Sequence, residues 1–132
     1  MRFEISTDYA IRALRLLYTN DGEALTAMDI ALSIGTTSPI FSKIANKLKS
    51  SGLIKTVQGR GGGYVLGKPA NEISIYNVYL CIEGELRLNH CLENGELCEH
   101  GEEVRCNVHE MLYGIQDDLV EKLSNVFISD LV

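Results

Sequence analysis

A run of glycines around a single arginine, residues 58–64, constrains the fold more than any other stretch of this chain. It lies between two segments rich in β-branched, aromatic and aliphatic residues, 53–57 and 64–66, which predict two short strands. Glycines supply the positive φ angles that a tight reversal needs. A phosphate-binding glycine loop would instead open a helix after its strand. The sequence therefore predicts a β-hairpin whose bare tip, carrying Arg60, can approach a phosphate backbone closely.

A helix-turn-helix pattern comes directly before this hairpin. Thr26 as N-cap, an acidic residue three positions later and a terminal Gly35 predict the first helix. After a short threonine turn, Ser38 as N-cap and Pro39 in the first turn predict a second helix that ends near residue 51. The two helices and the hairpin together predict a winged helix-turn-helix.

The apolar residues of these helices recur at helical spacing. An earlier helix over 7–19, capped by Ser6 or Thr7, completes a three-helix core. The side chains expected to be buried in the second helix of the pair are Ile40, Phe41, Ile44, Ala45 and Leu48.

The outward face of that second helix is cationic and carries amide and hydroxyl groups. Lysines neutralise phosphates, and an asparagine can read an adenine edge. An ordinary solvated helix face would look the same residue by residue, but the adjoining hairpin favours a recognition helix. The residues expected to contact DNA are Ser38, Ser42, Lys43, Asn46 and Lys47 in the helix and Gln58, Arg60, Gly61 and Tyr64 in the wing.

Charge divides the chain into two parts. Residues 1–70 hold nine Lys or Arg against five Asp or Glu, and residues 71–132 hold three against thirteen, so balances of +4 and −10 give the net charge of −6. We expect the basic part to be the DNA-binding region and the acidic part to serve sensing and dimerisation. No apolar run approaches the roughly 20 residues of a membrane span, and the amphipathic start is no signal peptide. These features predict a cytoplasmic protein.

The acidic part, residues 71–132, is expected to contain two helices and a long loop. A linker helix over 71–83, capped near Ser74, precedes an acidic loop at 84–105. A long helix over 106–128 then carries an apolar stripe, which favours pairing with a second copy of the chain. The predicted fold is therefore mainly α with a small β-hairpin wing, namely a winged helix-turn-helix plus a long C-terminal dimerisation helix.

Three cysteines gather around this loop. Cys91, Cys98 and Cys106 have the spacing C-x6-C-x7-C, and His109 follows as C-x2-H. Thiolates suit iron–sulfur clusters or zinc, and an imidazole can complete a set of four ligands. Loop thiols without a ligand role are the alternative. Cys81, within the linker helix, is expected to be a small buried hydrophobe.

Three stretches give the chain a family resemblance. STDYAIRAL at 6–14, KLKSSGLI at 47–54 and GRGGGY at 59–64 resemble the Rrf2 family of bacterial winged-helix transcriptional regulators, over essentially the whole chain. The resemblance implies a homodimer joined by its long C-terminal helices and a partly palindromic double-stranded DNA operator.

The cluster-binding branch of the family implies a 2Fe-2S or 4Fe-4S cluster on Cys91, Cys98 and Cys106. It offers His109, or with less support Asp8 from the other subunit, as the fourth ligand. A first-turn acidic residue is also stabilised by the helix dipole without any metal. The cysteine spacing here is wider than the C-x5-C-x5-C of cluster-binding members, a departure that bears on the type of cluster.

The function expected is that of a sequence-specific DNA-binding transcriptional regulator, a repressor, that senses iron–sulfur, redox, nitric oxide or iron status through a cluster on the cysteine loop. No nucleophile, base and orienting group can be assembled, so neither an enzyme nor a small-molecule substrate is expected. One alternative is a family repressor without a cluster, controlled by a protein partner or by thiol oxidation. Another, of a different class, is an iron–sulfur carrier or redox protein, against which the basic region and the wing argue.

Overall fold

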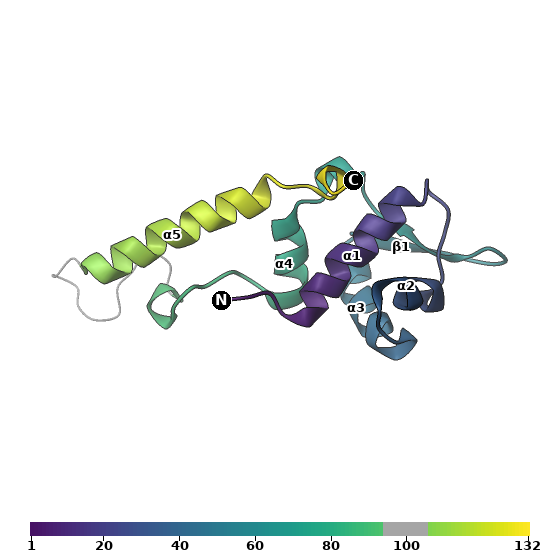
Figure 1. Cartoon of the computed structure of the whole chain (residues 1–132), viewed down its shortest axis with the longest axis horizontal. Coiled ribbons are helices and arrows are strands. Elements are labelled where there is room, and N and C mark those ends of the chain that lie inside the picture. The colour runs from purple at the N-terminus through teal and green to yellow at the C-terminus, as the bar shows by residue number, and fades with distance from the viewer. Residues whose placement is uncertain (94–105) are drawn as a thin grey trace.

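The computed structural model describes residues 1–93 and 106–132 as a mainly helical molecule with one β-hairpin (Figure 1). A helical unit with the hairpin lies at one end, and a long helix projects from it toward the other end. The described elements are α1 (Ile5–Thr19), α2 (Ala27–Ile34), α3 (Ser38–Ser50), β1 (Ile54–Val57), β2 (Gly63–Leu66), η1 (Ala70–Glu72), α4 (Ile75–Glu83), η2 (His90–Leu92), α5 (Asn107–Ser124) and η3 (Ile128–Asp130). The predicted winged helix-turn-helix fold is thus confirmed.

The helix-turn-helix pair forms where local signals predict it. The hydroxyl of Thr26 accepts a hydrogen bond from the backbone N–H of Asp29, and the Asp29 carboxylate accepts one from the Thr26 N–H, which closes a capping box. Gly35 ends α2 in the left-handed conformation at φ 86°. The core beneath α1, α2 and α3 contains Ala10, Ala13, Leu14, Leu17, Ile30, Ala31, Phe41, Ile44, Ala45 and Leu48.

The start of α3 differs from the prediction by one residue. Its N-cap is Thr37, whose hydroxyl accepts from the Ile40 N–H at 3.4 Å, while Ser38 is the first helical residue. Ile40 was expected in the core but is 48% exposed. Phe41 is fully buried beside it, because the buried side of α3 is centred on Phe41, Ile44, Ala45 and Leu48.

The start of α1 also departs from the prediction. The helix begins at Ile5, and neither Ser6 nor Thr7 caps it. Thr7 is fully buried and donates its hydroxyl proton to the Glu83 carboxylate at 2.5 Å, and the same oxygen accepts from the Glu4 N–H at 3.1 Å. A side chain at the end of α4 therefore supplies the acceptor that α1 lacks locally.

The hairpin is fastened to the helical unit by backbone bonds. β1 and β2 pair antiparallel with Val57 opposite Gly63. Tyr64 exchanges two backbone hydrogen bonds with Leu25, at 2.7 and 3.1 Å, ahead of α2. The Tyr64 ring packs edge-on against Phe41, with centroids 5.9 Å apart. The wing therefore has a fixed base on the body and a tip that extends from it (Figure 1).

The prediction of a single linker helix over 71–83 is wrong. The chain forms the short η1, then an extended pair of residues, and then α4, which Ser74 caps. The break arises because the Ile73 carbonyl accepts from the Ile128 N–H at 2.9 Å and the Ile75 N–H donates to the Val126 carbonyl at 2.8 Å. The end of the chain thereby pairs with the start of α4.

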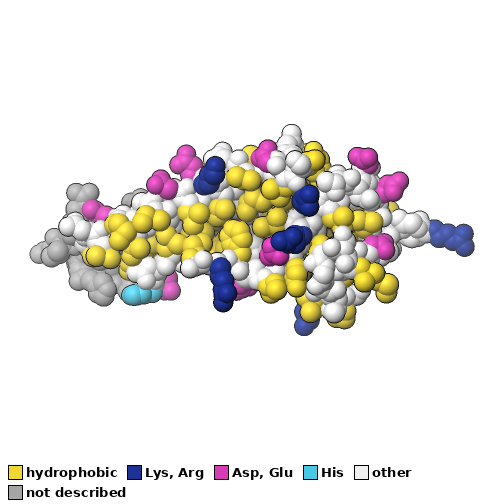
Figure 2. Space-filling view, in the orientation of Figure 1, with side chains coloured by type: hydrophobic (Ala, Val, Ile, Leu, Met, Phe, Trp, Pro, Cys, Tyr) yellow, Lys and Arg dark blue, Asp and Glu magenta, His cyan; other side chains and the backbone are white. Residues whose placement is uncertain are grey.

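The long helix α5 ends at Ser124, four residues before the predicted limit, since the following residues make the contacts with α4 just described. Its buried side chains are polar, His109 and Gln116, whereas Val108, Met111 and Ile115 are exposed. Figure 2 shows hydrophobic side chains in a band along this helix. Among the described residues, no helix is long and apolar enough to cross a membrane.

The base of the wing gives a test of the fold. We expect Gly63→Ala to lower the free energy of unfolding by more than about 2 kcal/mol, because its Cβ would lie 2.3 Å from the Leu25 carbonyl oxygen at φ +148°. Gly61→Ala is the matched control, since it has a positive φ but open space around it, and should cost about 1 kcal/mol. Urea unfolding midpoints measure both. Equal losses for the two variants would contradict the close packing at Gly63.

Candidate DNA-binding surface and cysteine site

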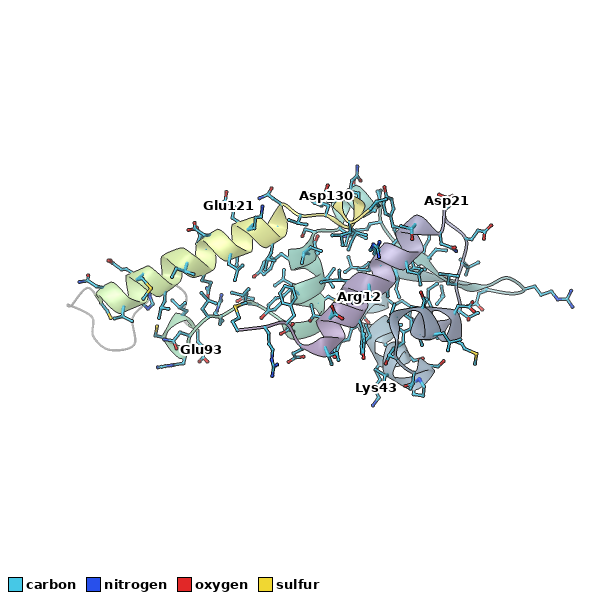
Figure 3. The ribbon with its side chains drawn as sticks, viewed as in Figure 1. Arg12, Asp21, Lys43, Glu93, Glu121 and Asp130 are labelled. Atoms are coloured by element: carbon cyan, nitrogen blue, oxygen red, sulfur yellow. The ribbon has the colours of Figure 1, made fainter. Side chains whose placement is uncertain are left out.

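The outward face of α3 carries most of the predicted helical contacts. Lys43 and Asn46 are exposed, and Ser38 and Ser42 are half-buried at the edges of that face. Figure 3 shows Lys43 pointing away from the body of the molecule. Because these side chains share one helix with a firmly buried opposite side, they can enter a groove together.

Lys47 is exposed like Lys43 and Asn46, but its side chain makes a contact with α4. Its Nζ atom donates to the Ile82 carbonyl oxygen in the last turn of α4 at 3.4 Å. Cys81, expected to be a buried hydrophobe, is half-buried, and its thiol donates to the Lys47 carbonyl at 3.2 Å while accepting from the Ser51 hydroxyl at 3.1 Å. The sequence offers no local signal for these contacts, since they join residues about 30 positions apart.

The wing presents its polar residues at the tip. Gln58, Arg60 and Gly61 are exposed. The turn is closed by a bond from the Gly62 N–H to the Gly59 carbonyl at 3.0 Å. A basic side chain projects from the hairpin end of the molecule (Figure 2). Tyr64 is half-buried at the base, so its ring braces the wing while Arg60 is free to enter a groove.

Two of the three predicted thiolates fall within the described residues. Cys91 lies in η2, is only 5% exposed and accepts a hydrogen bond from the Asn89 side-chain amide at 3.4 Å. Cys106 is half-buried at the N-cap position of α5. Cys98 lies outside the described residues.

His109 lies in the first turn of α5 beside this cysteine pair. It is 5% exposed, and its Nδ1 atom is closed off from solvent. η2 packs against α5, and the Leu88 N–H donates to the side-chain oxygen of Gln116 at 2.8 Å, which holds the segment before Cys91 against the helix. Cys91, Cys106 and His109 therefore belong to two segments that pack together, and thiols and an imidazole are donors that suit an iron–sulfur cluster or zinc.

The described residues hold part of the predicted ligand set. Across residues 1–93 and 106–132, no three His, Cys, Asp or Glu side chains are grouped closely enough to hold a metal ion. The third thiolate, Cys98, falls in the remaining stretch. The two thiols and His109 therefore fit an iron–sulfur cluster in their chemistry, but the described residues do not by themselves form a metal site.

Asp8, the other predicted ligand, is engaged elsewhere in the same chain. Its carboxylate forms an ion pair with Arg12 one turn along α1, at 2.9 Å. The hydrogen bond that Arg12 donates to Asp8, followed by the attraction of the Asp8 charge, raises the pKa of Arg12. Both side chains are largely exposed, so this pair adds little to stability.

Glu83 is a further residue that the sequence did not single out. Its carboxylate binds the start of α1 from a position directly before the cysteine-bearing segment. Burial, and after it the negative charge of Glu83, raises the pKa of Tyr79 above its usual value. No periodicity signals this contact, because it depends on how α4 packs across α1.

A basic helix in a helix-turn-helix, followed by a wing with an arginine at its tip, defines a DNA-binding transcriptional regulator. Comparison with family models gives the finer class. The model named Rrf2, described as an iron-dependent transcriptional regulator, matches residues 3–132. The chain therefore belongs to the Rrf2 family of transcriptional regulators, which are not enzymes.

Individual relatives agree with this family. The chain is 30% identical over 134 residues to the HTH-type transcriptional regulator IscR of Pectobacterium atrosepticum, spanning all of this chain and 79% of that protein. It is 34% identical to Protein aau3 of Rhizobium meliloti, spanning 85% of that protein.

Solved structures share the fold. The global cysteine regulator CymR of B. subtilis has a TM-score of 0.81 at 22% identity and covers 99% of this chain and 95% of its own. IscR of T. potens has a TM-score of 0.78 at 19% identity and covers 99% of this chain and 85% of its own.

Proposed function

We propose that this regulator is a repressor whose affinity for its operator depends on an iron–sulfur cluster held by Cys91, Cys98 and Cys106. The observation that carries the proposal is that η2, which bears Cys91, packs against α5, which has Cys106 at its N-cap and the buried His109 in its first turn. The family description as iron-dependent and the similarity to IscR support it. A bound cluster would make DNA binding responsive to iron–sulfur supply, redox state, nitric oxide or iron.

His109 is the proposed fourth ligand. It lies one turn beyond Cys106 on the same helix and is buried beside it. Asp8 is the second choice, and it would have to leave Arg12 and act from the other subunit. The donor set fits either a 2Fe-2S or a 4Fe-4S cluster.

The proposed DNA surface joins α3 to the wing. Lys43 would neutralise a phosphate, Asn46 would reach a base edge in the major groove, and Arg60 would enter the adjacent minor groove. The fixed base of the wing would hold α3 and the wing in a constant orientation to each other. The remaining members of this proposed surface are Ser38, Ser42, Gln58, Gly61 and Tyr64.

The proposed assembly is a homodimer formed through α5. Val108, Met111 and Ile115 follow one another at three- and four-residue steps and are all at least half exposed, with Leu112 and Leu119 half-buried beside them. Apolar residues at this spacing form a stripe that pairs with a second helix. A two-fold dimer would read a partly palindromic operator.

A second candidate is a family repressor without a cluster, controlled by a protein partner or by thiol oxidation. It is favoured by the fold shared with CymR and by the Asn89 side chain, which already gives the Cys91 thiol a hydrogen-bond donor.

The visible absorption spectrum tests the cluster. After anaerobic reconstitution with iron and sulfide, the parent protein should be coloured. Cys91→Ala and Cys106→Ala should lose that colour and change operator affinity, because each removes a thiolate. Cys81→Ser is the matched control, because it keeps a hydrogen-bonding group beside α3. This variant should retain both the colour and the operator affinity of the parent protein. A colourless parent protein that still binds DNA would shift the proposal to the candidate without a cluster.

Sequence selection from random duplexes tests the wing. Arg60→Ala should lose the preference for a narrow minor groove beside the site and bind about tenfold more weakly, because a groove-inserted arginine reads shape as well as charge. Lys55→Ala, on strand β1 away from the tip, serves as the charge-matched control and should keep the parent's preference. An Arg60→Ala protein with unchanged affinity and preference would remove the wing from the DNA surface.

Sedimentation velocity tests the dimer. The parent chain should be dimeric at micromolar concentration, and Ile115→Glu should be monomeric, because it places a charge within the apolar stripe. Glu121→Lys changes a side chain on α5 that points away from the body (Figure 3) and should stay dimeric. A monomeric parent chain would remove the basis for a palindromic operator.

A further inference from the structure

The last turns of α3 and α4 are joined by three hydrogen bonds. The Lys47 ammonium donates to the Ile82 carbonyl, the Cys81 thiol donates to the Lys47 carbonyl, and the Ser51 hydroxyl donates to the Cys81 sulfur. These four residues are called the α3–α4 latch below. The latch fixes the C-terminal end of the recognition helix to the helix that leads into the cysteine-bearing segment.

We propose that Lys47 is a positioning residue for DNA recognition and not a phosphate contact. Successive residues of a helix are about 100° apart, so Lys43 and Lys47, four positions apart, are offset by about 40° around α3. That offset turns Lys47 toward α4, whereas Lys43 points away from the body (Figure 3). The Lys47 ammonium lies at the C-terminal end of α4, where the helix dipole favours a cation.

Positioning and phosphate contact have different consequences for DNA binding. A phosphate contact adds affinity for every sequence, whereas base edges are read only when the recognition helix is held in the correct orientation. A latch residue therefore contributes to binding of the preferred sequence and leaves binding of other sequences unchanged. This inference rests on the proposed sequence-specific DNA binding but not on a cluster.

The experiment compares two lysines of one helix. A duplex selected by the parent protein from a random pool and a scrambled duplex of the same composition are titrated by fluorescence anisotropy at several KCl concentrations. Lys43→Met, the control, should weaken binding of both duplexes and reduce the slope of log K against log salt by about 0.9. Lys47→Met, which keeps the length of the side chain but has no donor, should weaken binding of the selected duplex about fivefold, the effect of one ordinary hydrogen bond, and leave the slope and the scrambled duplex unchanged.

Two further measurements make the result decisive. Lys47→Arg should restore the parent's discrimination, because a guanidinium can also donate to the Ile82 carbonyl. Without DNA, Lys47→Met should speed amide hydrogen exchange in the last turn of α3, which reports on the latch itself.

Each contrary result has a distinct meaning. A slope loss of about 0.9 in Lys47→Met would identify Lys47 as a phosphate contact and overturn the inference. Unchanged discrimination in that variant would overturn it as well. The parent protein could also select no sequence from the random pool while the amides in the last turn of α3 still exchange slowly. That result would overturn the proposed function instead.

Discussion

The carboxylate of Glu83 is the interaction on which the arrangement of the DNA-binding unit depends. It accepts from the buried Thr7 hydroxyl and from the Glu4 N–H, so α4 holds the start of α1, which has no side-chain cap of its own. Since α1 supplies much of the core beneath α2 and α3, the position of the recognition helix depends on α4. Removing the carboxylate would leave a buried hydroxyl without its acceptor, which is costly.

Local chemistry made the helix-turn-helix and the wing predictable from the sequence. The Thr26 capping box, Gly35 after α2 and the glycines of the wing each specify a backbone conformation within a few residues. The strands and the recognition helix accordingly lie within about a residue of their predicted bounds. The local errors lie at helix starts: Thr37 and not Ser38 caps α3, where Ile40 is exposed, and neither Ser6 nor Thr7 caps α1.

Long-range contacts decided what could not be predicted. The break ahead of α4 depends on backbone bonds between Ile73 and Ile128, and the shorter α5 has the same cause. Lys47 lies on the predicted outward face, yet its amine reaches Ile82, a contact that no residue pattern records. For the cysteine site, sequence identified the chemistry of Cys91 and Cys106, but their burial depends on η2 packing against α5.

The two attachments of α5 have a consequence for how a dimer would measure DNA. Leu88 holds the helix through Gln116, and the residues after Ser124 pair with the start of α4, so α5 is attached both at its middle and at its C-terminal end, which resists rotation about its own axis. In a two-fold dimer, the angle between the two DNA-binding units, each made of α3 and the wing, would then be fixed by the backbone. Inserting one base pair between half-sites rotates them by about 35°, and neither protomer could follow that rotation.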